Sequence, residues 1–101
     1  MTADDARRLA TSLPDVVERD HHGFRSFRTG LRGRIFATLP TEEILRVMLD
    51  EGSIREAVAE WPWCREGWWG KRLRTVEVVL ADADAPSVAE LLADGHARAR
   101  S

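Results

Sequence analysis

Residues 24–49 read FRSFRTGLRGRIFATLPTEEILRVML, and this stretch sets the fold of the chain. The segments 24–29 and 34–39 are rich in the aromatic and β-branched residues that favour strands, and two glycines lie in the turn between them. In the segment 44–49 the side chains alternate so that one face is wholly apolar, which predicts a third strand. A short helix is the alternative for 44–49, because some of its side chains also recur at helical spacing.

Outside this stretch the sequence predicts three helices and a fourth strand. The helix signals are a capping box formed by Thr2 and Asp5, a second capping box formed by Ser53 and Glu56, and Pro86 in a first turn. The predicted elements are a helix at 3–13, a linker at 15–23, strands at 24–29, 34–39 and 44–49, a helix at 53–61, a tryptophan-rich loop at 62–71, a strand at 73–81, and a last helix from Asp84 or Ala85 up to Gly95.

The resulting order, αβββαβα, describes one α+β domain over residues 1–101. Short turns between the first three strands favour an antiparallel four-stranded sheet, and helices packed on one face leave the other face open to solvent or to a partner. Strand alternation predicts the direction of each side chain. Those expected to point inward are Phe27, Ile35, Ala37, Leu45, Val47, Val76 and Val78, and those expected on the open face are Ser26, Arg28, Arg34, Phe36, Arg46, Met48, Glu77 and Val79.

The composition is that of an ordinary globular domain. Of the 101 residues, 44% are hydrophobic and 32% are charged, and the formal net charge is −2. The length suits one domain, and no segment approaches the ~18 apolar residues of a membrane span. A single cysteine excludes an intramolecular disulfide and, with no signal peptide visible, predicts a reducing, cytoplasmic location.

Positive charge is concentrated in two islands. Residues 21–36 carry four arginines and no acid, and residues 65–76 carry four basic residues and one acid. The second island also holds Trp68 and Trp69, which point in opposite directions if the chain is extended, so one of them is expected to be exposed. Solvated hairpin or loop faces are the simplest explanation of such islands, but surface arginines also neutralise phosphates and exposed tryptophans stack on bases.

Several local patterns recur along nearly the whole chain. They are Leu13-Pro14-Asp15, His22-Gly23, Ser26-Phe27-Arg28, GRIFATL at 33–39, GWWGK at 67–71 and TVEV at 75–78. In this order and spacing they resemble the MmcQ/YjbR family. The resemblance implies a frataxin-like, or CyaY-like, two-layer α/β sandwich that binds DNA through a double-wing arrangement. The chain departs from the family pattern at two places. The first hairpin, at 29–34, is longer than the usual turn, which is expected to change a wing. Gly95-His96 stands where the family often has Ala-Trp, which is expected to change a core contact.

Two functions are therefore expected. The first is non-enzymatic DNA binding, and the alternative is a protein-interaction or small-ligand module at the tryptophan-rich loop and the open sheet face. A single basic stripe formed by both islands would favour nucleic acid, whereas islands separated around a tryptophan pocket would favour a ligand. The candidate phosphate-binding residues are Arg25, Arg28, Arg32, Arg34, Lys71, Arg72 and Arg74, with Trp68 and Trp69 as stacking or ligand-binding residues.

No catalytic, metal or cofactor site is predicted. Cys64 lies beside Arg65 but has no assignable general base, and the histidines have no triad partner. The glycines form no phosphate-binding fingerprint. Acids within residues 4–20 cluster near His21 and His22, as metal handling of the frataxin kind would require, but arginines interleave and no fixed ligand spacing is present.

Overall fold

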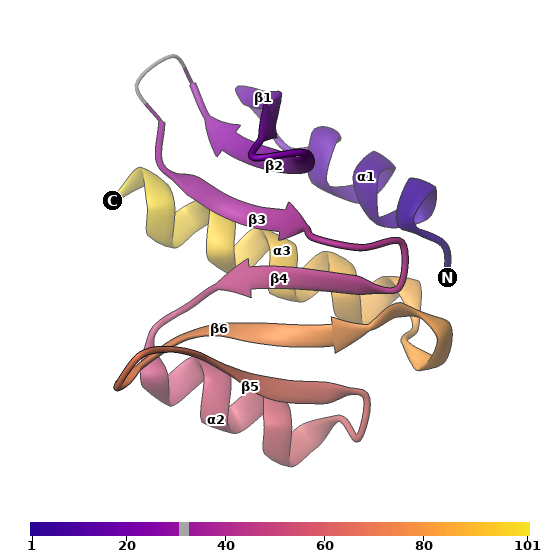
Figure 1. Ribbon diagram of the computed structural model, residues 1–101, viewed down its shortest axis with the longest axis vertical. Coiled ribbons are helices and arrows are strands. Elements are labelled where there is room, and N and C mark those ends of the chain that lie inside the picture. Colours follow the sequence, from indigo (N-terminus) through magenta and orange to yellow (C-terminus); the bar gives the residue numbers. More distant parts are fainter. Residues whose placement is uncertain (31–32) are drawn as a thin grey trace.

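The computed structural model describes residues 1–30 and 33–101, and within them it contains six strands where the sequence predicts four. The strands form one antiparallel sheet in the order β1-β2-β3-β4-β6-β5, and the helices pack against one of its faces (Figure 1). The α+β class and the antiparallel sheet are confirmed, but the order of elements is αββββαββα. The elements are α1 (Ala3–Thr11), β1 (Val16–His21), β2 (Phe24–Thr29), β3 (Ile35–Leu39), β4 (Ile44–Met48), α2 (Glu51–Glu60), β5 (Cys64–Trp69), β6 (Arg72–Val79), the short 3₁₀ helix η1 (Leu80–Asp82) and α3 (Ala85–Arg100).

The two additional strands form the edges of the sheet. β1 occupies the predicted linker, and β5 occupies most of the predicted tryptophan-rich loop. In each of these strands a glutamate points toward the helices. A charged residue at an inward position interrupts the alternation of apolar and polar residues by which a strand is recognised in a sequence. Glu18 of β1 pairs with Arg7 of α1 at 2.8 Å, and Glu66 of β5 pairs with Arg55 of α2 at 3.3 Å. The edge strands are therefore anchored by ion pairs to helices as well as by the sheet ladder.

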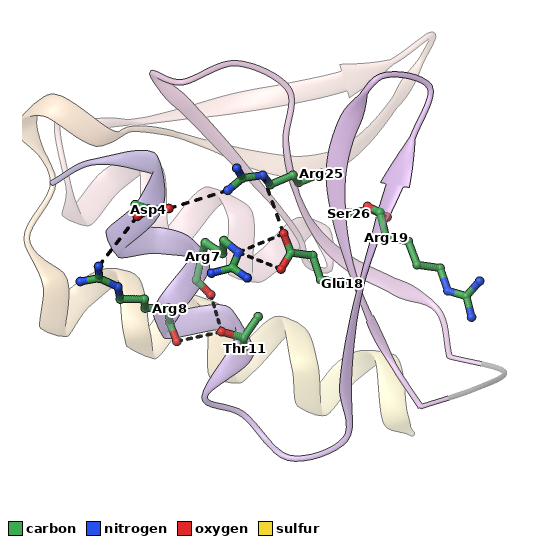
Figure 2. A network of polar contacts seen from close by, with 8 residues as sticks. All are labelled: Asp4, Arg7, Arg8, Thr11, Glu18, Arg19, Arg25 and Ser26. Carbon is green, nitrogen blue, oxygen red and sulfur yellow. Dashed lines mark hydrogen bonds and ion pairs between the residues drawn. The ribbon is translucent and has the colours of Figure 1, made fainter.

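A network of ion pairs joins α1 to the hairpin of β1 and β2 (Figure 2). The Nε of Arg7 donates to both carboxylate oxygens of Glu18, at 2.8 and 3.1 Å, and the Nε of Arg25 lies 3.7 Å from the same carboxylate. Asp4 lies 3.9 Å from Arg25 and 3.8 Å from Arg8. Arg25 is thus directed toward α1, on the helix side of the sheet.

Two of the three helices begin where the sequence predicts. The capping box of Thr2 and Asp5 is present in α1, and Asp84 caps α3. The predicted box of Ser53 and Glu56 is wrong, because α2 starts earlier and the side chain of Asp50 accepts the Ser53 backbone N–H at 2.8 Å. The segment 44–49 forms the strand β4 over Ile44–Met48 and is not a helix. Within the described residues no helix is long and apolar enough to cross a membrane.

Six of the seven side chains predicted to point inward are fully buried, and Ile35 is half-buried. Phe36, predicted on the open face, is instead fully buried. The register between β2 and β3 shifts between Phe27 and Arg28, which leaves Phe36 as an extra residue of β3. Such a bulge redirects side chains, and here the Phe36 ring lies edge-on to His96 of α3 with the ring centroids 5.3 Å apart.

The helix α3 continues through Gly95, where the sequence predicts its end. A Cβ at this position would lie 2.7 Å from Cγ1 of Val47 and 3.4 Å from the carbonyl oxygen of Phe36. Glycine is therefore required here for close approach of α3 to β3 and β4, not for a helix terminus. Nε2 of the buried His96 donates to the carbonyl oxygen of Pro14 at 2.7 Å, so this position makes a polar contact within the core.

Candidate nucleic-acid interface at one end of the sheet

The end of α3 and the hairpin of β5 and β6 lie at the same end of the sheet (Figure 1). A cleft opens there. Strands β3 and β6 begin at this end, and β4 ends there. The cleft has a volume of about 450 Å³, within the range of roughly 300–1,000 Å³ typical of ligand pockets. We call it the arginine cleft; its lining residues are Arg34, Ile35, Met48, Trp69, Arg74, Gly95, Arg98 and Ala99.

Three arginines from distant parts of the sequence line this cleft, and none of its described lining residues is acidic. Arg34 directly precedes β3, Arg74 lies in β6, and Arg98 lies in the last turn of α3. The pKa of Asp50, the cap of α2, is lowered by the hydrogen bond from the Ser53 backbone N–H and to a smaller extent by the charge of Arg98. The cleft is therefore a cationic site with one carboxylate within electrostatic range of its rim.

Trp69 provides an aromatic wall beside these cations. The guanidinium carbon of Arg74 lies 5.3 Å from the centroid of the Trp69 ring, a cation–π contact that orients both groups. Trp69 is 50% exposed and Trp68 is 48% exposed, so both are exposed where the sequence predicts that one of them is. Both residues end an edge strand next to the turn at Gly70, where the sheet has no further neighbour on that side.

The predicted phosphate-binding residues are distributed over several surfaces. Arg34 and Arg74 line the arginine cleft, and Lys71 and Arg72 are exposed at the adjoining hairpin tip. Arg28 alternates with the buried Phe27 on β2 and lies on the face away from the helices. The ion pairs of Arg25 with α1 remove it from this end of the sheet, and Arg32 lies outside the described residues.

The two basic islands therefore meet at the cleft through one arginine each, and Trp69 of the edge strand β5 lies beside β6, which carries Arg74. Sequence reasoning missed Arg98, because it placed the end of the last helix at Gly95. The available signal was the segment 96–100, whose alanines and arginines favour a helix and continue it. Gly95, Arg98 and Ala99 then share one helical face at spacings of three and four residues.

The other candidate groups have structural roles. Asp4 and Glu18 pair with arginines, and Asp5 accepts the Thr2 backbone N–H in the capping box of α1. The part of the chain that the structure describes holds no group of three or more histidine, cysteine, aspartate or glutamate side chains placed to bind a metal. Cys64 is 4% exposed, and burial raises the pKa of its thiol to about 11.

The Cys64 pKa predicts a loss of stability at high pH. The ordinary pKa of the thiol is 9.0, and in the folded chain it is about 11. At pH values between these two, the thiol ionises in the unfolded chain but not in the folded one, so the free energy of unfolding falls as the pH rises through this range. The fall amounts to at most roughly 2–3 kcal/mol. Urea unfolding at pH 8 and pH 11 measures it.

The Cys64→Ala variant is the control for this measurement, because it lacks the titrating thiol. The chain has no tyrosine, so few other groups titrate in this range. We expect the variant to lose less stability than the wild type between the two pH values. Equal losses in the two proteins would show that the Cys64 thiol is not the group responsible.

Comparison of the chain with protein-family models, with curated proteins and with solved structures gives no match. The chemical character of the arginine cleft is accordingly the main guide to function. A surface that combines three guanidinium groups with an exposed indole suits a ligand that combines negative charge with a flat ring.

Proposed function

We propose that this protein binds nucleic acid at the arginine cleft, without catalysing a reaction, and that DNA is the ligand, as its resemblance to the MmcQ/YjbR family implies. The observation that carries the proposal is the convergence of Arg34, Arg74 and Arg98 beside the exposed Trp69. A nucleotide presents both a phosphate, which the planar guanidinium fork matches, and a base, which can stack on an indole. A CyaY-like sandwich with the β2–β3 and β5–β6 hairpins as its wings is part of the same proposal.

The distribution of charge supports binding at this end despite the net charge of −2. Four carboxylates, from Glu56, Glu60, Glu90 and Asp94, line a hollow between α2 and α3, whereas the described lining of the arginine cleft holds only basic and uncharged residues. Local potential, not net charge, steers a polyanion to its site. Binding is therefore expected to be strongly dependent on salt.

Fluorescence anisotropy of labelled single-stranded and duplex DNA, at low and at moderate salt, tests the proposal. With about three phosphates contacted, the logarithm of the binding constant should fall with a slope of about −2 against the logarithm of the salt concentration for a single strand. Quenching of tryptophan fluorescence should accompany binding, since Trp69 lines the cleft. Absence of binding even at low salt would contradict the proposal.

The volume of the arginine cleft also favours a second candidate, a small aromatic anion. Such a ligand would quench the fluorescence of Trp69 with a stoichiometry of one ligand per protein. In that case the affinity of the protein for oligonucleotides would not increase with their length. If duplex and single-stranded DNA both fail to bind while a mononucleotide does, this second candidate replaces the first.

A further inference from the structure

The sheet face away from the helices, here called the open face, carries a second set of arginines. Strand register aligns one residue from each of the six strands in a row across this face. Glu18 and Arg25 face α1 through their ion pairs, so their neighbours Arg19 and Ser26 face the opposite way, and Figure 2 shows Arg19 extending away from the α1 network. The row is Arg19, Ser26, Thr38, Arg46, Glu77 and Arg65.

Ion pairs confirm that the second half of this row shares one face. The Nε of Arg46 donates to Glu77 at 2.8 Å, and Arg65 lies 4.0 Å from the same carboxylate. Glu77 is the single acid in the row and pairs with two of its three arginines. Between Arg19 and Arg46 only the short, buried side chains of Ser26 and Thr38 intervene, so the guanidinium groups are the most extended groups on this part of the face.

Arg28 adds a fourth cation to the open face and has an unmet hydrogen-bonding need. It is half-buried, and its Nε is buried with no hydrogen-bond partner among the described residues. The residue as a whole is only half-buried, so an anion that docks on this face can contact the exposed part of the guanidinium group. With Arg28 included, the face carries four arginines against Glu77.

The arginine cleft is lined by α3 on the helix side of the sheet, and the open face begins across the end of β4 from it. Met48 pairs with Thr75 on the open face and also lines the cleft. Arg46 lies two residues earlier on the same strand, which places its Cα about 7 Å from that wall of the cleft. Arg19 lies three strands away from Arg46, or about 14 Å at the usual strand spacing. Cations therefore lie in the cleft on one side of this sheet end and across most of the sheet on the other side.

We infer that the open face is a phosphate-binding surface that continues the arginine cleft, so that the protein holds a single strand several nucleotides long. The inference rests on the proposed function and names its substrate class. One unpaired base occupies the cleft against Trp69, and the following phosphates lie on Arg46, Arg28 and Arg19. A duplex is excluded from this arrangement, because its bases are already stacked and paired and cannot reach the indole.

Oligonucleotide length separates the open face from the cleft. We expect the affinity for 5′-fluorescein-labelled oligo-dT, measured by anisotropy at low salt, to rise at least tenfold from dT2 to dT8, since only the longer strand reaches the open face. The double variant Arg19→Ala/Arg28→Ala should lose about tenfold in dT8 affinity and keep the wild-type dT2 affinity. Circular dichroism and thermal unfolding verify that the variant is folded.

A variant that is expected to bind dT8 more tightly serves as a second test, because general damage to the protein cannot raise its affinity. Glu77→Gln removes the one acid of the row and releases Arg46 and Arg65, so dT8 should bind several-fold more tightly while dT2 is unaffected. Arg8→Ala is the matched control for the arginine substitutions, because Arg8 is an exposed residue of α1 on the helix side and should change neither affinity.

Each outcome of this experiment decides the inference. Equal affinities for dT2 and dT8, or a length dependence untouched by both open-face variants, would overturn it and leave binding at the cleft intact. Tight binding of dT2 and of duplex alike would also overturn it. Competition by poly-glutamate as strong as that by oligo-dT of equal charge would show a general site for acidic chains and overturn it as well. No binding of any oligonucleotide would instead defeat the proposed function itself.

Discussion

Reversal of charge at Arg34 and Arg98 together is expected to weaken nucleic-acid binding by about a hundredfold at low salt. Both residues are exposed and line the arginine cleft, and each substitution by glutamate replaces an attraction to phosphate with a repulsion. Arg74 is left unchanged, so that its cation–π contact with Trp69 and the shape of the cleft are retained. Anisotropy titrations of a single strand against salt measure the loss.

The salt dependence identifies the mechanism of that loss. The logarithm of the binding constant falls linearly with the logarithm of the salt concentration, and each phosphate contact on a single strand contributes about 0.7 to the slope. Removal of two contacts should therefore make this slope less steep by about 1.4. The control is Arg8→Glu compared with Arg98→Glu alone, since each changes the net charge by the same amount and Arg8 lies on α1, away from the described lining of the cleft. An equal loss in this control would show that net charge, and not the cleft, governs binding.

Substitution of Gly95 by alanine is expected to lower the free energy of unfolding by about 2 kcal/mol or more. In an exposed helix this change is stabilising by about 1 kcal/mol, because alanine is the better helix former. At Gly95 the added Cβ would lie 2.7 Å from Cγ1 of Val47 and 3.3 Å from the carbonyl oxygen of Met48. Backbone oxygens cannot rotate away, so α3 must shift from the sheet, and such overpacking outweighs the helical gain.

Gly52→Ala is the matched control for this effect. Gly52 lies in α2, is exposed, and an added Cβ there would meet only Oδ1 of Asp50 at an ordinary distance of 3.4 Å. We expect the control to be neutral or slightly stabilising in urea unfolding. A Gly95→Ala protein as stable as the Gly52→Ala protein would mean that α3 does not lie against β3 and β4 as closely as the structure shows.

Helix starts were readable because a cap is a local interaction. In α1 the capping hydrogen bonds join Thr2 and Asp5, and in α3 the Ser87 backbone N–H donates to Asp84. Each of these bonds joins residues only three positions apart, so the pattern can be recognised in the sequence. The start of α2 was misplaced because Asp50, Ser53 and Glu56 offer two overlapping signals of the same kind, and Asp50 is the one used.

The edge strands were harder to predict, because their inward charges are matched by partners far along the chain. Glu18 pairs with Arg7 and Glu66 pairs with Arg55, and in both pairs the arginine lies 11 residues earlier in the chain. A turn signal was nevertheless present between β1 and β2. His22 and Gly23 have φ values of 52° and 88°, as the favoured two-residue hairpin turn requires, but histidine is a rarer residue there than asparagine or aspartate.

By itself the sequence determined the α+β class, the four central strands, two of the three helix starts and the concentration of arginines near two hairpins. Only the tertiary structure decided which of these arginines act together. Arg25 is directed to α1, Arg28 to the open face, and Arg34 and Arg74 to a cleft completed by Arg98. The reason is physical: capping and alternation depend on neighbours within a few residues, whereas the direction and pairing of a charged side chain depend on strand register and helix packing between distant segments.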